Sequence, residues 1–199
     1  MKKFLIVLLT LVLAFAMTFS LVACDEGDKN DDKEKEKEEE ENTTEPIPET
    51  TQNKEPVPTP EGYTLYNNGK ISFAYPDTWK ESDGILADEN SAVNNITVTF
   101  EQKSDIYINM DVESFNSTLK PVFEQAGLTV TDPSVEQLTN DNNTRITKIC
   151  CTTAVYGVTM KQTMLIVAVG DLNYVITVTE GTPDAALVEN VYKTLDIIE

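Results

Sequence analysis

Three long stretches rich in β-branched residues follow one another in the last third of the chain, and they constrain the fold most. They span Thr144–Tyr156, Val158–Val169 and Asn173–Thr179, separated by Gly157 and by Gly170-Asp171. Such short connections suit antiparallel hairpins, because a parallel crossover needs a dozen residues or more. The run "MLIVAV" (164–169) is apolar at successive positions. The stretch that contains it is therefore predicted to be a central strand with both faces covered.

Three further segments that precede these stretches also have strand patterns. "ISFAYP" (71–76) places Ile71, Phe73 and Tyr75 on one face, and "ITVTFE" (96–101) alternates apolar and polar residues. Alternation of this kind is typical of a half-buried strand. "TVTDPSVEQL" (129–138) predicts a strand that is interrupted at Pro133.

Two amphipathic segments predict the helices that would cover the sheet. In the first, apolar residues recur at helical spacing between Asp111, a candidate N-cap, and Gly127, a candidate C-terminal stop. Pro121 is predicted to kink or split this helix. The second helix is predicted to begin at Thr182-Pro183-Asp184 and has an apolar stripe: Leu187, Val191 and Leu195, flanked by Val188 and Tyr192. The expected fold class is α+β, an antiparallel β-sheet covered by helices on its faces.

The start of the chain has the features of a targeting segment. Lys2 and Lys3 precede an uncharged, mainly apolar run from Phe4 to Ala23. A run of about 20 apolar residues suits a membrane-spanning helix or the apolar region of a secretory signal peptide.

The tetrapeptide Leu21-Val22-Ala23-Cys24 favours the second of these interpretations, because it resembles the bacterial lipobox. The resemblance implies that residues 1–23 are a lipoprotein signal peptide, that Leu21, Val22 and Ala23 are recognised by lipoprotein signal peptidase, and that Cys24 carries a diacylglyceryl group. Two acyl chains are enough for stable membrane anchoring, whereas one is marginal. We therefore expect Cys24 to be a lipid anchor on the extracytoplasmic face of a bacterial membrane.

Residues 24–62 are predicted to be a disordered tether that follows the lipidated cysteine. Between Asp25 and Glu61 there are 15 acidic residues and 5 lysines, together with five closely spaced prolines. A segment with high charge and low hydrophobicity cannot bury enough surface to offset its conformational entropy. Charge repulsion and proline both favour an extended chain.

Residues 63–199 are predicted to form one domain, because the only Trp and all seven Tyr lie there. The opening "GKISFAYPDTW", a helix followed by "GLTV", the run "YGVTMKQTMLIVAVGDLNYVITVTEG" and a last helix ending in "TLDII" follow one another in this region. This order resembles the PsbP-like fold of photosystem II subunit P, Mog-type Ran-binding proteins and bacterial lipoproteins of the DcrB type. The resemblance implies a non-catalytic scaffold that binds other proteins.

The composition excludes several kinds of chemistry. The sequence has no histidine, which excludes histidine-dependent triads and HExxH metal sites. Its glycines form no phosphate-binding loop, and a net charge of −19 argues against nucleic acid as a partner. The candidate acids for a carboxylate-pair enzyme are Asp88, Glu89, Glu101, Asp105 and Glu180. The oxygen-rich segments 88–90 and 141–144 lack EF-hand spacing, so we expect neither a metal nor a cofactor.

Six aromatic residues lie at or near the ends of the predicted strands: Tyr63, Tyr66, Tyr75, Trp79, Tyr156 and Tyr174. Core packing with a hydrogen-bonded polar tip explains most residues of this kind. Aromatic residues also concentrate at binding surfaces, so a binding patch formed by some of the six stays open.

The adjacent cysteines Cys150 and Cys151 are predicted to be free thiols. Consecutive Cα atoms lie about 3.8 Å apart, which is below the usual range for a disulfide. Successive side chains of a strand also point to opposite faces. We therefore expect at least one of the two to be buried beneath a helix.

Together these features predict a monomeric, lipid-anchored protein-interaction module that is not an enzyme and that docks on another envelope protein. The alternative is a lipoprotein that binds a small molecule or a lipid, which needs a pocket. A carboxylate enzyme would instead need two acids facing each other in one cleft.

Overall fold

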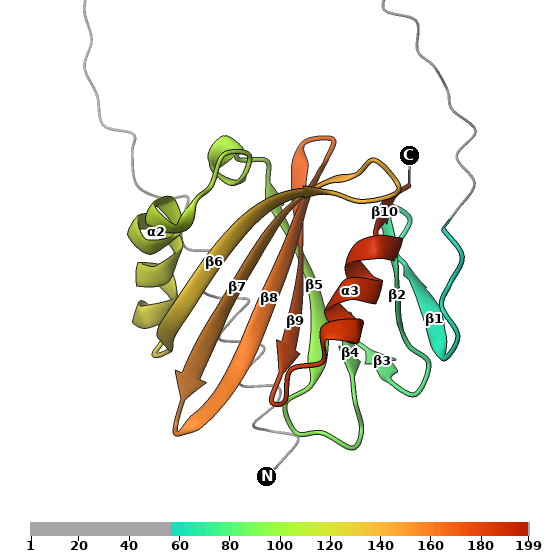
Figure 1. The fold of residues 1–199 in the computed structure, drawn as a ribbon, viewed down its shortest axis with the longest axis horizontal. Helices are drawn as coiled ribbons and strands as arrows, with labels where there is room; N and C mark the ends of the chain where they lie inside the picture. The colour runs from blue at the N-terminus through green and yellow to red at the C-terminus, as the bar shows by residue number, and fades with distance from the viewer. Residues whose placement is uncertain (1–56, 199) are drawn as a thin grey trace, which may run out of the picture.

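The computed structural model describes residues 57–198, which form two antiparallel sheets and two α-helices (Figure 1). The large sheet has seven strands in the order β3-β4-β5-β9-β8-β7-β6. Their bounds are β3 Lys80–Ser82, β4 Ile85–Ala87, β5 Asn95–Gln102, β6 Thr129–Thr139, β7 Arg145–Val155, β8 Val158–Val169 and β9 Leu172–Glu180. The small sheet has three strands in the order β1-β2-β10: β1 Tyr63–Asn67, β2 Ile71–Pro76 and β10 Asp196–Ile197.

The predicted series of hairpins is confirmed. Tyr156 and Gly157 connect β7 to β8 and both have positive φ, 49° and 79°, while Val155 and Val158 pair directly before and after them. Two positive φ values in a two-residue loop match the twist of antiparallel strands. Gly170 and Asp171 connect β8 to β9 in the same antiparallel sense. The β7–β8–β9 meander therefore follows from local turn chemistry.

Strand β6 continues past Pro133, although the sequence predicts an interruption there. The pairing with β7 shifts between Thr131 and Ser134, and Asp132 has a φ of 52°. A bulge places Pro133 out of register with the ladder, so the strand does not need a backbone N–H from that residue. Pairing resumes on the far side of the bulge.

The first predicted helix is confirmed as α2, Val112–Gln125. The carboxylate of Asp111 accepts a hydrogen bond from the Ser114 N–H at 2.8 Å, which satisfies one of the free donors at the helix start. Gly127 has a φ of 84°, suited to the C-terminal stop. Of the two effects predicted for Pro121, a kink or a split, the split is wrong, because Pro121 lies within a continuous helix.

The second helix is α3, Ala185–Thr194, and it begins two residues later than the sequence predicts. Its N-cap is Asp184, whose carboxylate accepts from the Ala186 and Leu187 N–H groups at 2.9 and 3.4 Å. The Asp184 N–H itself donates to the carboxylate of Glu180 at 2.5 Å. This acceptor, four residues earlier in the chain, satisfies the backbone just before the helix, so Thr182 is not needed as the cap.

The two faces of the large sheet are covered differently, and we name them by the helix that each contacts. On the α2 face, Phe115 and Phe123 of α2 pack with Ile149, Met164 and other residues of the sheet. On the α3 face, Leu187 and Val191 of α3 pack with Leu165 and with the buried face of the small sheet. Residues 164 to 167 of β8 point alternately to the two faces of the sheet, and all four are buried. The prediction of a strand covered on both faces is therefore confirmed.

The prediction of a single sheet is incomplete, since β1, β2 and β10 form a separate sheet beside α3 (Figure 1). Strand β10 has only two residues, and Ile197 pairs with Ile71. A two-residue strand carries no periodic pattern, and its partner is more than a hundred residues away. The coarse expectation of an antiparallel α+β fold holds.

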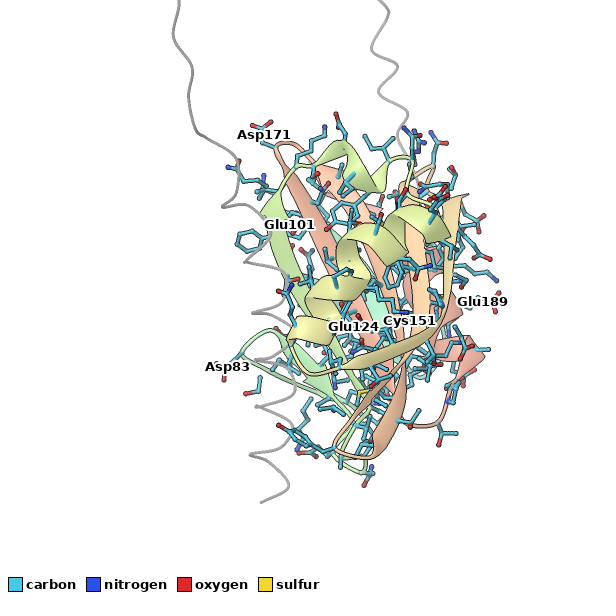
Figure 2. The ribbon with its side chains drawn as sticks, turned by 90° about the vertical axis from the view of Figure 1, so that its left-hand side faces the viewer. Asp83, Glu101, Glu124, Cys151, Asp171 and Glu189 are labelled. Carbon is cyan, nitrogen blue, oxygen red and sulfur yellow. The ribbon has the colours of Figure 1, made fainter. Side chains whose placement is uncertain are left out.

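The two cysteines of β7 lie on opposite faces of the large sheet, as predicted. Cys151 is buried on the α2 face, close to α2 (Figure 2). Cys150 is half-buried on the α3 face, and both thiols are free. Burial raises the pKa of the Cys151 thiol to about 12, which makes it a poor nucleophile.

Candidate functional site

A pocket of about 440 Å³ lies between α3 and the α3 face of the large sheet, and we call it the α3 pocket. Its wall is mainly apolar and comes from β6, β7, β8, the end of β9, the residues just before α3 and one face of α3. The residues that line it are Leu138, Lys148, Cys150, Lys161, Thr163, Glu180, Pro183, Asp184, Ala185, Val188, Glu189 and Tyr192. A volume of this size suits a small ligand.

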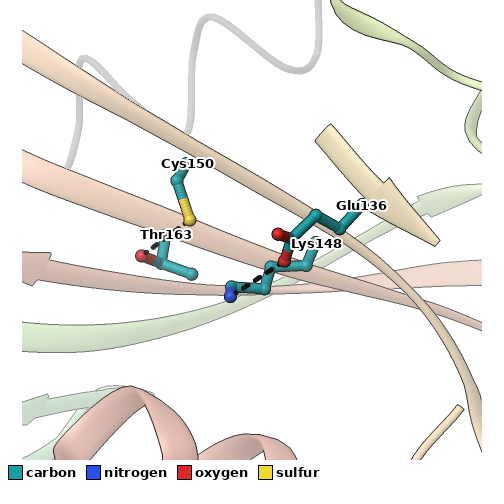
Figure 3. Close-up of polar contacts among 4 residues, drawn as sticks. All are labelled: Glu136, Lys148, Cys150 and Thr163. Carbon is teal, nitrogen blue, oxygen red and sulfur yellow. Dashed lines mark hydrogen bonds and ion pairs between the residues drawn. The ribbon is translucent and has the colours of Figure 1, made fainter. Parts of the chain in front are cut away.

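The floor of the α3 pocket is set by the register of three strands. Cys150 of β7 pairs with Thr163 of β8, and Lys161 of β8 pairs with Glu180 of β9. Directly paired residues place their side chains on the same face of a sheet. The Cys150 sulfur lies 3.5 Å from the Thr163 hydroxyl oxygen (Figure 3). Polar side chains from separate strands thus gather where the apolar run of β8 ends.

The roof of the α3 pocket is one stripe of α3. Ala185, Val188, Glu189 and Tyr192 recur at the three- and four-residue spacing of one helix face, beside the stripe that is buried in the core. The Tyr192 hydroxyl donates to the Thr139 backbone oxygen at 3.0 Å. This bond links α3 to the end of β6 beside the pocket.

Two ion pairs neutralise charges at the edges of the pocket. Lys148 lies 3.1 Å from the carboxylate of Glu136, its neighbour across β6 and β7 (Figure 3). Lys193 lies 2.6 Å from Glu189, one turn earlier on α3. These exposed or half-exposed pairs contribute little to stability. Their effect on the site is that Lys148 and Glu189 already have counter-charges.

Glu180 is the buried acid of the site, with 1% of its surface exposed. Burial raises the pKa of its carboxyl group, while the hydrogen bond from the Asp184 N–H and the charge of Lys161 act in the opposite direction. The carboxylate therefore has a structural role, since it joins the end of β9 to the first turn of α3.

The pocket also bears on the prediction about paired carboxylates. Three acids line it, but each is engaged: Glu180 accepts from the backbone, Asp184 caps α3, and Glu189 pairs with Lys193. The other candidate acids lie outside the pocket. Asp88 accepts from the Asn90 N–H in its own loop, and Glu89 pairs with Lys80. Within residues 57–198, no group of three or more potential ligands could hold a metal ion.

The six aromatic candidates do not form one exposed patch. Tyr66, Tyr75, Trp79 and Tyr174 are buried in the core on the α3 face, and Tyr63 packs against that core. Only Tyr156 is fully available, with 89% of its surface exposed at the β7–β8 turn. The four buried rings fill the space between the two sheets. Tyr192 is the aromatic residue that lines the pocket; its place beside a predicted apolar stripe was the one signal in the sequence.

Phe100 lies on the same alternating face of β5 as Ile96, which predicts that it is buried. It is instead 66% exposed and contacts the ring of Tyr174 with centroids 5.8 Å apart. Alternation gives the face of the sheet on which a side chain lies, but it does not show how far the covering layer extends.

Cys24, the signal-peptidase residues Leu21 to Ala23 and most of the predicted tether lie outside the described residues. Between residues 57 and 198, no helix has the length and apolar character needed to cross a membrane.

Comparison with solved structures shows a similar fold despite low sequence identity. The solution structure of cyanobacterial PsbP (CyanoP) from Synechocystis sp. PCC 6803 matches with a TM-score of 0.50 and 10% identity, and covers 68% of this chain and 92% of that chain. A crystal structure from Bacteroides thetaiotaomicron VPI-5482 matches with a TM-score of 0.36 and 12% identity, and covers 69% of this chain and 48% of that chain. The sequence has no significant match to a protein-family model or to a curated protein. The match to CyanoP shows that the described domain has a PsbP-like α+β fold.

Proposed function

We propose that this chain is a non-catalytic binding module, held on the extracytoplasmic face of a bacterial membrane by lipidated Cys24, and that its ligand binds in the α3 pocket. The pocket is the observation that carries this proposal. Its volume of about 440 Å³ falls within the range of small-molecule sites. Its mainly apolar wall with a few polar groups at the floor is also typical of such sites.

The proposal of binding without catalysis is supported by how the polar groups of the pocket are used. The sequence has no histidine to act as a general base. The acids of the wall accept from backbone N–H groups or pair with a lysine. No pair of these groups is free to exchange protons with a substrate.

A photo-crosslinking experiment in intact cells tests the proposed site. A photoreactive amino acid replaces Ala185, which lines the pocket at the start of α3 and is exposed. The matched control replaces Asn116, an exposed residue of α2. We expect irradiation to add a low-mass adduct at position 185 and none at position 116. The same adducts at both positions, or none at either, would reject the pocket as the binding site.

A second candidate function is a protein-interaction module, which a different surface favours. Tyr156 is 89% exposed at the tip of the β7–β8 hairpin, next to Val158, which is also exposed. Exposed tyrosines are common anchors in protein interfaces. The same experiment with the photoreactive residue at position 156 tests it. A protein-sized adduct from position 156 and none from position 185 would favour this function over ligand binding.

A further inference from the structure

One stretch of β5 forms an open edge of the large sheet. Strand β4 pairs with β5 only from Asn95 to Thr97, whereas β9 pairs with it as far as Gln102 (Figure 1). Within the described residues, no strand pairs with positions 98–102 on the side away from β9. Alternate residues of this segment therefore direct their backbone N–H and C=O groups away from the sheet. Such groups are a template for pairing with another extended chain.

The other edges of the large sheet have features that hinder pairing. Strand β6, at the far edge, has a bulge at Asp132 next to Pro133, and β3 has only three residues. Bulges, prolines and short strands are common means of protecting an edge. The segment 98–102, "VTFEQ", has no proline, and its pairing with β9 shows no shift in register. This part of β5 is therefore the least protected edge of the sheet.

Phe100 lies at the middle of the open segment, and 66% of its surface is exposed. Its ring contacts the ring of Tyr174 with centroids 5.8 Å apart, which places it on the α3 face. The neighbouring Glu101 points to the other face, where its side chain is the hydrogen-bond partner of Tyr107. The open edge thus offers a backbone ladder together with an exposed aromatic ring.

Two charges of opposite sign lie at the two ends of the open segment. Asp83 belongs to the β3–β4 turn, which adjoins one end because Ile85 pairs with Thr97. Lys103 follows the other end. Both residues are exposed, and neither forms an ion pair with any of residues 57–198. An edge with an acid at one end and a base at the other is complementary to a second copy of itself in the antiparallel direction.

We propose that the open edge of β5 pairs with the same edge of a second copy of this chain, antiparallel and centred on Phe100, to form a symmetric dimer. In this register Val98 lies opposite Gln102 of the second copy. Lys103 of the second copy then comes next to Asp83, and the two-fold symmetry forms this charge pair twice. The dimer differs from the monomer that the sequence predicts, and it does not depend on the α3 pocket.

The side chains of the segment are compatible with this register. The two Phe100 rings lie opposite each other on one face, and aromatic pairs across neighbouring strands are stabilising. Glu101 lies opposite Thr99 of the second copy, so no two acids face each other directly. The pairing also satisfies the outward backbone groups of both copies.

Disulfide formation in intact cells tests the dimer and its register. Phe100→Cys places a thiol directly opposite its own copy, where the Cα atoms are about 4.5–5.5 Å apart and within the range of a disulfide. The matched control is Gln102→Cys, at an exposed position of the same strand. In the proposed register the two copies of position 102 are four residues apart along the strand, more than about 13 Å, which is too far. The parent protein gives the background from its native cysteines.

The cells are treated with the oxidant diamide, and covalent dimer is measured on non-reducing gels. We expect Phe100→Cys to form dimer at least about tenfold faster than Gln102→Cys or the parent, because pairing gives its thiols a high effective concentration.

The charge pair is tested in the Phe100→Cys protein. Lys103→Asp places two acids side by side and should slow the reaction by about fivefold. With Asp83→Asn also present, Lys103→Asp should slow it by less than about twofold, since the opposing charge is gone. Asn tolerates the positive φ of 53° at position 83, so the turn is retained. Within one copy the two positions are separated by the open segment, so their coupling reports contact between copies.

Four outcomes would contradict the proposal. Dimer formation by Phe100→Cys no faster than in the parent would overturn the pairing of two copies. Equal rates for Phe100→Cys and Gln102→Cys would also overturn it, because they indicate random collision without a fixed register. A disulfide between position 100 and a different protein, in place of the dimer, would show that another chain occupies the edge. An effect of Lys103→Asp that is the same with and without Asp83→Asn would overturn the charge pairing.

Discussion

Replacing Gln162 with Met is expected to stabilise the domain. Gln162 lies in β8 on the α2 face, with none of its surface exposed. Neither its amide nitrogen nor its amide oxygen has a hydrogen-bond partner within the described residues. A buried polar group without a partner costs about 1–3 kcal/mol. Met has a similar length and no polar group that needs a strong partner, so we expect the free energy of unfolding to rise by about 1–3 kcal/mol.

Two other glutamines of the large sheet provide matched controls for the same substitution. The Gln137 amide donates to the Tyr107 backbone oxygen at 3.0 Å and accepts from the Thr147 hydroxyl group at 2.9 Å. Gln137→Met should therefore lower the free energy of unfolding by about 1 kcal/mol. Gln102 is exposed at the end of β5, so Gln102→Met should change it by less than about 0.5 kcal/mol.

Urea denaturation of the parent and the three variants, followed by the fluorescence of the single tryptophan, measures these differences. The slope of the transition should be the same for all four proteins if the substitutions leave the two-state behaviour intact. A loss of stability for Gln162→Met as large as that for Gln137→Met would refute the reasoning. It would mean that the Gln162 amide is hydrogen-bonded in solution, for instance to a buried water molecule.

The remaining predictions concern one carboxyl group and three cysteines. Burial raises the pKa of the Glu180 carboxyl group above its ordinary value of 4.5, so the folded state favours the protonated form. The contribution of this group to the free energy of unfolding is therefore fully present below pH 4.5 and is lost as the pH rises through the raised pKa. Glu180→Gln should thus gain stability over the parent with rising pH; denaturation curves showing a pH-independent difference would contradict this. Cys24→Ser should abolish labelling by radioactive fatty acid, and persistent labelling would disprove the lipid anchor. Burial raises the pKa of the Cys151 thiol to about 12. In the native protein, N-ethylmaleimide should therefore modify Cys150 well before Cys151. Mass spectrometry showing equal rates would place Cys151 at the surface.

The parts of the fold that the sequence predicts are those determined by local chemistry. The β7–β8 turn needs positive φ at Tyr156 and Gly157, and a glycine between two β-branched runs indicates this directly. The start of α2 likewise depends on the carboxylate of Asp111, which accepts a hydrogen bond from the N–H of Ser114, three residues later. Such features involve neighbours in the chain, so the sequence contains both partners.

Features that depend on distant partners were missed or placed wrongly. The cap of α3 is an exception, since it moves to Asp184 because of a neighbour four residues earlier, Glu180, whose carboxylate accepts from the Asp184 N–H. Strand β10 exists only because Ile197 meets Ile71 across the small sheet. Trp79 and Tyr174 are buried in a cluster that also contains residues of the small sheet and of α3, elements distant in the chain. Local patterns indicate which residues are apolar but not which layer covers them.

The α3 pocket and the unpaired amide of Gln162 both arise at the point where β8 changes character. From Met164 onward the residues on both faces of the strand are apolar. The three residues before it, Lys161, Gln162 and Thr163, are polar and lie on alternate faces. On the α3 face, Lys161 is exposed and Thr163 is buried, and both line the α3 pocket. On the α2 face, Gln162 is fully covered, and its amide finds no partner within the described residues. The same break in the pattern thus places polar side chains in the wall of the proposed binding site on one face, and on the other face an amide without a partner that is expected to lower stability.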